Sequence, residues 1–199
     1  MSTALIYRSS LAYESVMRLL YGRHFGSRYR AIADRIPAGA TVVDVCCGPP
    51  LLYRRYLRAK GVDYLGIDLN PRPARALAAA GARGMVCDVS RLQELPAAEI
   101  VLMQASLYHF LPEPQPLIDK MVAAATRRVI IAEPIRNLSD SRNRLVAWSA
   151  RRLTNPGDGA PERRFTESTL DQLFAQYGSR VLESLVIPGG REKIYVIEK

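Results

Sequence analysis

The sequence predicts an α/β fold in which helices cover both faces of a mostly parallel β-sheet. Five short apolar runs alternate with helical segments through the middle of the chain, as in successive βαβ units. The run TVVDV ends near Asp44 and a glycine turn, and the apolar run that follows the next helix ends at Asp68. Two further strand-like runs surround PGGRE near the C-terminus, which predicts a final antiparallel hairpin.

Each predicted element rests on its own pattern. Residues 3–35 carry apolar side chains at helical spacing, and interruptions near Gly22 and Gly26 predict two helices before the sheet. The predicted strands are 40–45, 64–67, 84–87, 100–104 and 129–132, and the predicted helices between them are 51–60, 71–81 and 114–126. Thr166 begins a predicted helix that continues to Phe174, and strands at 181–188 and 193–199 form the hairpin.

The length of 199 residues and the 48% apolar content predict a single globular domain over 1–199. Its predicted parts are a helical cap (1–36), a core (37–135), an insertion (136–164) and the terminal helix with its hairpin (165–199). No signal-peptide pattern and no run of about eighteen uncharged apolar residues is visible, so we expect a cytoplasmic protein. Three cysteines and two distant histidines predict neither a disulfide framework nor a metal site.

The net charge of +9 is unevenly distributed. Residues 1–36 hold six arginines against two acidic residues, and residues 136–164 hold seven against three, so each segment carries +4. Such a field favours an anionic small molecule, a phosphate group, an anionic membrane surface or nucleic acid. The alternative is an ordinary solvated surface.

Four motifs in order resemble the class I S-adenosylmethionine-dependent methyltransferases, and the resemblance extends from about Ala40 to the C-terminus. TVVDVCCGPP is similar to the first motif, D-x-G-x-G-x-G, with Asp44 as its acid and Gly48 as its central glycine. Asp68 matches the acid that binds both ribose hydroxyls, and Asp88 in CDVS matches the residue that receives the adenine amino group. QASLYHFLP is similar to the segment that ends in L-h-H-h. The resemblance implies a Rossmann-like three-layer sandwich with a seven-stranded sheet and an antiparallel last strand.

The resemblance also implies S-adenosylmethionine (SAM) as cofactor and S-adenosylhomocysteine (SAH) as product. The cofactor-binding residues that it implies are Asp44, Cys46, Gly48, Asp68, Leu69, Asp88, Val89 and Gln104. A carboxylate at a strand end can accept hydrogen bonds from vicinal hydroxyls, and a glycine lets the backbone approach a ligand. The first motif departs from the family pattern, because Cys46 replaces its first glycine, Pro50 its last, and Pro49 removes a backbone donor. The alternative roles of the three acids are structural, as turn or cap residues.

The acceptor side has fewer signals. His109 is a candidate general base because the pKa of an unperturbed histidine lies near neutrality, and its alternative role is packing beneath the cofactor. Glu133 ends the fifth strand and either orients an acceptor or caps a loop. The sequence after Gln104 is ASL rather than [DN]PP[YF], which weighs against methylation of exocyclic base amines.

Three functions are compatible with these patterns. The first is methyl transfer to a small or lipid-linked acceptor with a negative group. The second is RNA methylation, which the charge favours, although aromatic residues do not interleave the basic ones as in a stacking platform. The third is a non-catalytic SAM-binding scaffold or sensor, which the altered glycine turn favours.

Overall fold

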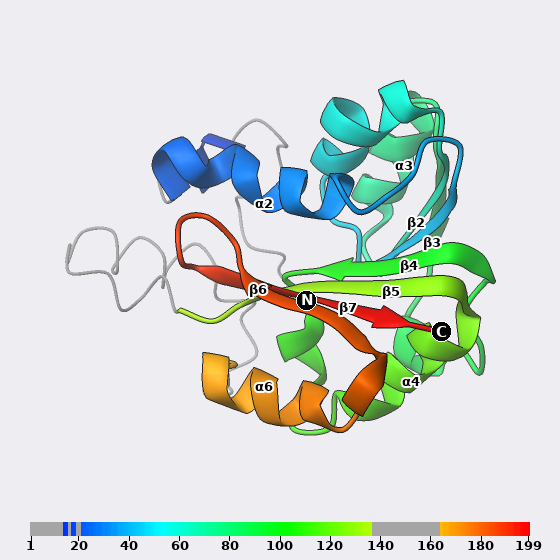
Figure 1. Ribbon diagram of the computed structural model, residues 1–199. Coiled ribbons are helices and arrows are strands. Elements are labelled where there is room, and N and C mark those ends of the chain that lie inside the picture. The colour runs from blue at the N-terminus through cyan, green and yellow to red at the C-terminus, as the bar shows by residue number, and fades with distance from the viewer. Residues whose placement is uncertain (1–13, 16, 19–20, 137–163) are drawn as a thin grey trace.

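The computed structural model describes residues 14–15, 17–18, 21–136 and 164–199, and within them seven strands form one sheet in the order β3-β2-β1-β4-β5-β7-β6 (Figure 1). The strands are β1 (Thr41–Val45), β2 (Asp63–Asp68), β3 (Arg83–Val86), β4 (Ala98–Gln104), β5 (Ala125–Pro134), β6 (Val181–Val186) and β7 (Glu192–Glu198). The first five pair in parallel, and β7 runs antiparallel to both β5 and β6. The predicted seven-stranded Rossmann-like fold with a final antiparallel strand is confirmed.

The described helices agree with most of the predicted ones. They are α2 (Phe25–Ala33), α3 (Pro71–Ala79), α4 (Gln115–Ala124) and α6 (Glu167–Ala175), with short turns at η2 (Gly22–His24), η5 (Val89–Arg91), η6 (Leu107–Phe110) and η8 (Gly178–Arg180). The predicted cap at Thr166 is confirmed, because its Oγ1 accepts a hydrogen bond from the backbone N–H of Thr169. The predicted helix over 51–60 is helical but irregular, with a π-helix η3 (Tyr53–Leu57) followed by a 3₁₀ turn η4 (Arg58–Lys60).

The N-terminal cap is described only in part. The predicted interruption near Gly22 is present, since Gly22 has a φ of +54° at the start of η2. Gly26, in contrast, lies inside α2, so the predicted break there is wrong. A Cβ on Gly26 would lie 3.2 Å from the hydroxyl oxygen of Tyr56, which indicates that this glycine permits close packing rather than a turn. Residues 1–13 of the cap and 137–163 of the predicted insertion lie outside the described residues.

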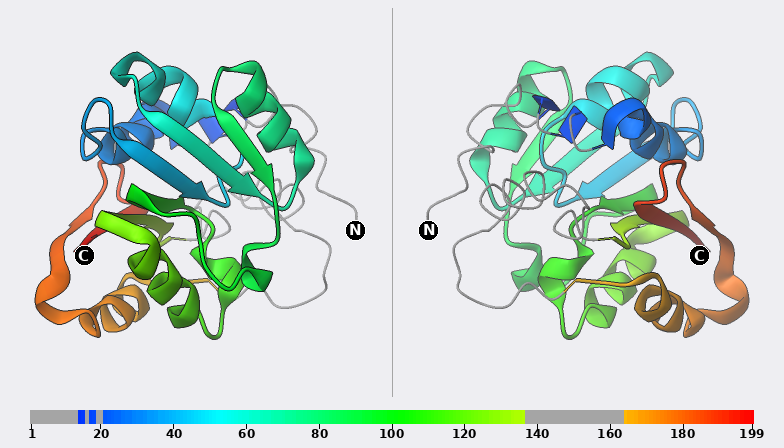
Figure 2. Two further views of the ribbon diagram at one scale, coloured as in Figure 1. Left: turned by 90° about the vertical axis from the view of Figure 1, so that its right-hand side faces the viewer. Right: turned by 90° about the vertical axis from the view of Figure 1, so that its left-hand side faces the viewer.

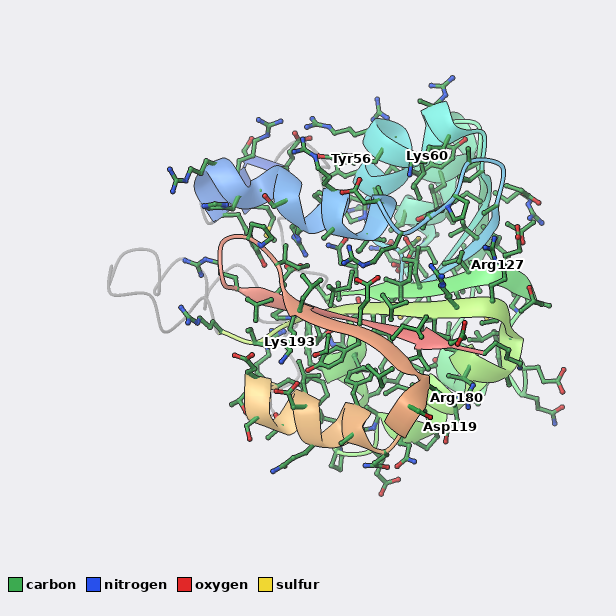
Figure 3. All side chains as sticks on the ribbon, viewed as in Figure 1. Tyr56, Lys60, Asp119, Arg127, Arg180 and Lys193 are labelled. Carbon is green, nitrogen blue, oxygen red and sulfur yellow. The ribbon has the colours of Figure 1, made fainter. Side chains whose placement is uncertain are left out.

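Two hydrophobic clusters cover the two faces of the sheet. The first cluster joins α2, the helical segment 51–60 and α3 to one face, and the second joins α4 and α6 to the other (Figure 2). Contacts between elements fix these layers: Lys60 Nζ donates to the carbonyl oxygens of Ala33 and Ile36 at 2.6 and 2.8 Å and so caps the end of α2 (Figure 3). On the other face, Lys193 Nζ lies 3.0 Å from Glu167 Oε1 and so joins β7 to α6.

Candidate functional site

The loops that follow β1 and β4 define the candidate site. From β1 the chain adds β2 and β3 on one side of the sheet, and from β4 it adds β5 on the other side, so the strand order reverses between β1 and β4. Ligands of open α/β sheets bind at such a point, beyond the carboxyl ends of the strands. Both loops open with a left-handed residue that is not glycine, Cys46 at φ +58° and Ala105 at φ +53°. The Ser106 hydroxyl donates to the carbonyl oxygen of Cys46 at 3.4 Å, so the two loops are in direct contact.

The first motif forms a turn with two left-handed residues despite its substitutions. Cys46 stands where the motif has its first glycine and adopts a left-handed φ, and Gly48 follows at φ +56°. The substitution therefore changes the side chain and adds strain without abolishing the backbone conformation. Burial, with a smaller contribution from Asp68, raises the pKa of the Cys46 thiol to about 12, so this thiol is protonated at neutral pH.

Asp44 lies beneath this turn and is 3% exposed. Its Oδ2 accepts a hydrogen bond from the hydroxyl of Tyr64 on β2, a partner that the sequence analysis did not identify. Oδ1 is buried and has no hydrogen-bond partner among the described residues. Burial raises the pKa of Asp44 to about 7, although the Tyr64 hydroxyl favours the charged form. A buried carboxyl with one unpaired oxygen is suited to a polar or cationic ligand group above the turn.

Asp68 ends β2 and binds the turn directly. Its Oδ2 accepts from the backbone N–H of Gly48 at 2.9 Å and its Oδ1 from that of Asn70 at 2.8 Å. Each oxygen keeps a further lone pair, so the carboxylate can still accept from two hydroxyl groups. The next residue, Leu69, is 66% exposed, so its apolar side chain lies at the surface beside this carboxylate. The pair presents a hydrogen-bond acceptor next to an apolar surface.

Asp88 and Val89 follow β3 at the same edge of the sheet. The Asp88 carboxylate accepts from both the backbone N–H and the hydroxyl of Ser90 and lies 3.3 Å from Arg91 Nε. The hydrogen bonds from Ser90 lower the pKa of Asp88. The side chain of Val89 is buried, so the part of this residue that can meet a ligand is its backbone. Asp88 also caps η5, so it has a structural role. The cap leaves further lone pairs of the carboxylate available.

Glu133 is fully buried at the end of β5 and holds the loop after β4. Its carboxylate accepts from the backbone N–H groups of Ser106, Leu107 and Tyr108 at 3.1, 3.0 and 3.4 Å. Burial raises the pKa of Glu133 to about 8, and the hydrogen bonds from Leu107 and Tyr108 oppose this rise. This geometry favours the loop-capping role of the two that the sequence left open.

His109 and Gln104 lie on either side of this capped loop. His109 is exposed in η6, and its ring centroid lies 4.0 Å from that of Tyr108. Arg164 stacks on the ring of Tyr108, with its guanidinium carbon 3.5 Å from the ring centroid. Gln104 ends β4, and its Nε2 donates to the carbonyl oxygen of Arg28 at 3.4 Å. The loop after β4 is thus joined to the N-terminal helix α2.

Among the described residues, no cluster of three histidine, cysteine or acidic side chains could hold a metal ion. Within the same part of the chain, no helix has both the length and the apolar character to cross a bilayer.

Comparison with known proteins identifies the class. Residues 18–184 match the family model described as a methyltransferase domain, which is most of the chain, so the chain belongs to this family. It is a SAM-dependent methyltransferase of the Rossmann-like class I, and SAM is its cofactor. A search of curated proteins found no match.

Similar solved structures share the fold. Magnesium protoporphyrin IX methyltransferase from Synechocystis PCC 6803, with bound SAH, is 17% identical over 97% of this chain and 96% of its own, with a TM-score of 0.63. A methyltransferase from Haloferax volcanii, in complex with the Trm112 methyltransferase activator, is 14% identical over the whole of both chains, with a TM-score of 0.68. The 16S rRNA methyltransferase RmtF, with SAH, is 18% identical over 96% of this chain and 65% of its own, with a TM-score of 0.59.

Proposed function

We propose that this protein transfers the methyl group of SAM to a small molecule that carries a negatively charged group. In this reaction the bond from sulfur to the methyl carbon breaks, a bond from the methyl carbon to the acceptor forms, and SAH leaves. The observation that carries the SAM-binding part of the proposal is the hydrogen bond between Gly48 and Asp68, because it joins the glycine turn to the carboxylate that would accept hydrogen bonds from a ribose.

The proposed cofactor contacts divide into three groups. Asp68 accepts from the ribose hydroxyls while Leu69 packs against the nucleoside. Asp88 accepts from the adenine amino group beside the backbone of Val89. The turn at Cys46 and Gly48, the buried Asp44 and the end of β4 at Gln104 surround the methionine portion. The unpaired, buried Oδ1 of Asp44 supports the fit, since a polar group of the ligand would give it a hydrogen-bond partner.

The proposed catalytic contribution is mainly positional. A methyl transfer needs the acceptor in line with the sulfur–methyl bond and shielded from water, and proximity alone can supply much of the rate. Glu133 fixes the loop that bears His109 by three backbone hydrogen bonds. His109, exposed at this edge, is the candidate base for an acceptor that must lose a proton.

The negative acceptor group is supported by the arginines at the same edge of the sheet. Arg136 follows β5, and Arg164 stacks on Tyr108 of η6. Arg191 precedes β7, whose first residue pairs with the last residue of β5. Arg136 and Arg164 stand at the two ends of the predicted insertion, and Arg191 belongs to the terminal hairpin.

RNA methylation is the second candidate, and the same cationic edge favours it, as does the likeness to the fold of RmtF. The scaffold hypothesis has less support, because the backbone at Cys46 is left-handed even though a cysteine replaces the glycine of the motif there.

The test measures SAH formation from SAM with matched acceptor pairs, each a carboxylic or phosphoric acid and its neutral ester or amide, and with mixed RNA. We expect turnover of acids above that of their neutral partners, with a decline as salt rises. Preference for RNA, or equal turnover of acids and neutral partners at all salt concentrations, would contradict the proposed acceptor class. Tight SAM binding with no turnover of any acceptor would favour the scaffold.

A further inference from the structure

A pocket of about 450 Å³ lies between the N-terminal helices and the turn that joins β6 to β7. Its lining residues are Tyr21, Gly22, Arg23, His24 and Arg28 on one side and Ile187, Pro188, Gly189, Arg191 and Glu192 on the other. In Figure 1, α2 and this turn lie side by side at the end of the sheet where β5 ends. The volume is in the range of small-molecule sites.

The floor of the pocket is a buried ion pair that is electrically balanced. Arg28 and Glu192 are 2% and 1% exposed, and Arg28 Nη2 lies 2.9 Å from Glu192 Oε1. The Tyr21 hydroxyl donates to the same oxygen at 2.6 Å, and the guanidinium carbon of Arg28 lies 4.8 Å from the Tyr21 ring centroid. Because these charges cancel, the pair fixes the two walls relative to each other and adds no net charge.

The rim, in contrast, has an uncompensated positive charge. Arg23 is exposed, and its Nε donates to His24 Nε2 at 3.1 Å, while the guanidinium carbon of Arg191 lies 5.9 Å from the Tyr21 ring centroid. In the described part of the chain, neither arginine has a carboxylate within ion-pair distance. Arg136 does not line the pocket but lies near its turn, with Nη1 3.9 Å from the position that a Cβ on Gly190 would take.

The turn itself closes against the first wall. Gly189 has a φ of +108°, and a Cβ there would lie 2.8 Å from Cβ of His24. The glycine therefore lets the turn approach the histidine, and the pocket keeps its shape only without a side chain at this position. Ile187 and the Tyr21 ring supply an apolar wall beside the cations.

We propose that this pocket binds the oxyanion, a carboxylate or a phosphate, of the methyl acceptor, and that Arg23 and Arg191 are its guanidinium contacts. The inference rests on the proposed function and names the part of the acceptor that this chain recognises. Guanidinium groups bind both oxyanions through paired N–H donors. Gln104 contacts the carbonyl oxygen of Arg28, and Glu192 pairs with Pro134, so the pocket adjoins the strand ends of the candidate site. An acceptor held there by its anionic end would direct its other end toward the loops after β1 and β4.

The test uses inorganic phosphate and hexanoate as separate probes, titrated at constant ionic strength while the arginine Nε–H signals are followed by NMR. The proteins are the wild type, Arg23→Gln, Arg191→Gln and the control Arg180→Gln. The Arg180→Gln substitution also removes one exposed positive charge, but Arg180 lies at the opposite end of β6 from the turn (Figure 3). SAH binding to all four proteins is measured by calorimetry.

We expect saturable binding of at least one probe, about tenfold weaker in Arg23→Gln and in Arg191→Gln and unchanged in Arg180→Gln. Tighter binding of phosphate or of hexanoate identifies which oxyanion the acceptor carries. SAH binding should be equal in all four proteins. The proposal is overturned by no saturable binding of either probe up to about 50 mM, by equal binding in all variants, or by a parallel loss of SAH binding in Arg191→Gln. Failure of the wild type to bind SAH would instead contradict the proposed function. The anion titration would still show whether the pocket binds an oxyanion.

Discussion

The hydroxyl group of Tyr64 donates a hydrogen bond to Oδ2 of Asp44 beneath the turn that follows β1. Both side chains are buried, and Oδ1 of Asp44 has no hydrogen-bond partner in the part of the chain that the structure describes. The fold therefore supplies a hydrogen-bond donor to one oxygen of this carboxyl and leaves the other without one. Because burial brings the pKa of Asp44 to about 7, its charge changes over the neutral range.

SAM binding should consequently depend on pH. The charged form of Asp44 attracts the cationic methionine portion, so we expect affinity for SAM to rise by roughly tenfold between pH 6 and 8. Asp44→Asn should remove this rise. Tyr64→Phe should move its midpoint to higher pH, because the hydroxyl favours the charged carboxylate. Calorimetric titrations at several pH values measure both effects, and an unchanged pH profile in Asp44→Asn would contradict this role.

The left-handed backbone at Cys46 predicts an unusual order of stabilities. A β-branched residue tolerates positive φ poorly, so Cys46→Val should unfold more easily than Cys46→Gly by about 1–2 kcal/mol. Cys87 is the control, because its φ is not positive and it follows a strand directly. There the valine variant should be at least as stable as the glycine variant. Urea denaturation gives the four values, and the same order at both positions would show that backbone strain at Cys46 is unimportant.

Glu133 predicts how stability changes with pH. Its folded-state pKa of about 8 lies above the ordinary value of 4.5, so between these values the folded protein holds a proton that the unfolded chain releases. The free energy of unfolding should therefore fall as pH rises from about 5 to about 8, by an amount on the order of 3 kcal/mol from this group. Glu133→Gln should flatten that dependence, and denaturation curves at several pH values will show whether its slope differs from that of the wild type.

Lys60 should stabilise the packing of the N-terminal helix on the sheet. Its ammonium group donates to two carbonyl oxygens at the end of α2, where the helix dipole favours a cation. Lys60→Met should lower the free energy of unfolding by about 1–2 kcal/mol. Arg58→Met is the matched control, because Arg58 is an exposed cation two residues away in the same turn. Equal stability of the two variants would exclude the cap as a source of stability.

The sheet could be predicted from the sequence because each strand is indicated by a short run of consecutive residues. Asp44, Asp68 and Asp88 each follow a short apolar run, so their place at the carboxyl ends of strands was visible without any tertiary contact. The strand bounds differed by a few residues, most at β5, which begins four residues earlier than predicted because Ala125 already pairs with Ala98.

The contacts that complete the site are not local. Tyr64 on β2 donates to Asp44 on the neighbouring strand β1, and Arg28 pairs with Glu192, which is 164 positions further along the chain. No spacing rule relates such positions, and a buried arginine has the same sequence signature as an exposed one. The role of Glu133 as a loop cap likewise depended on the path of the loop after β4. Sequence patterns therefore predicted the strand ends better than the contacts between residues far apart in the chain.

Calorimetric titration of SAH into the purified protein tests whether the turn at Gly48 and the carboxylate of Asp68 form a SAM site. The variants are Asp68→Ala and the control Asp63→Ala, which removes an exposed carboxylate from the other end of the same strand. We expect micromolar binding to the wild type and to Asp63→Ala, and binding about 10- to 100-fold weaker in Asp68→Ala. Equal affinity in all three proteins, or no binding of SAH to the folded wild type, would contradict the account.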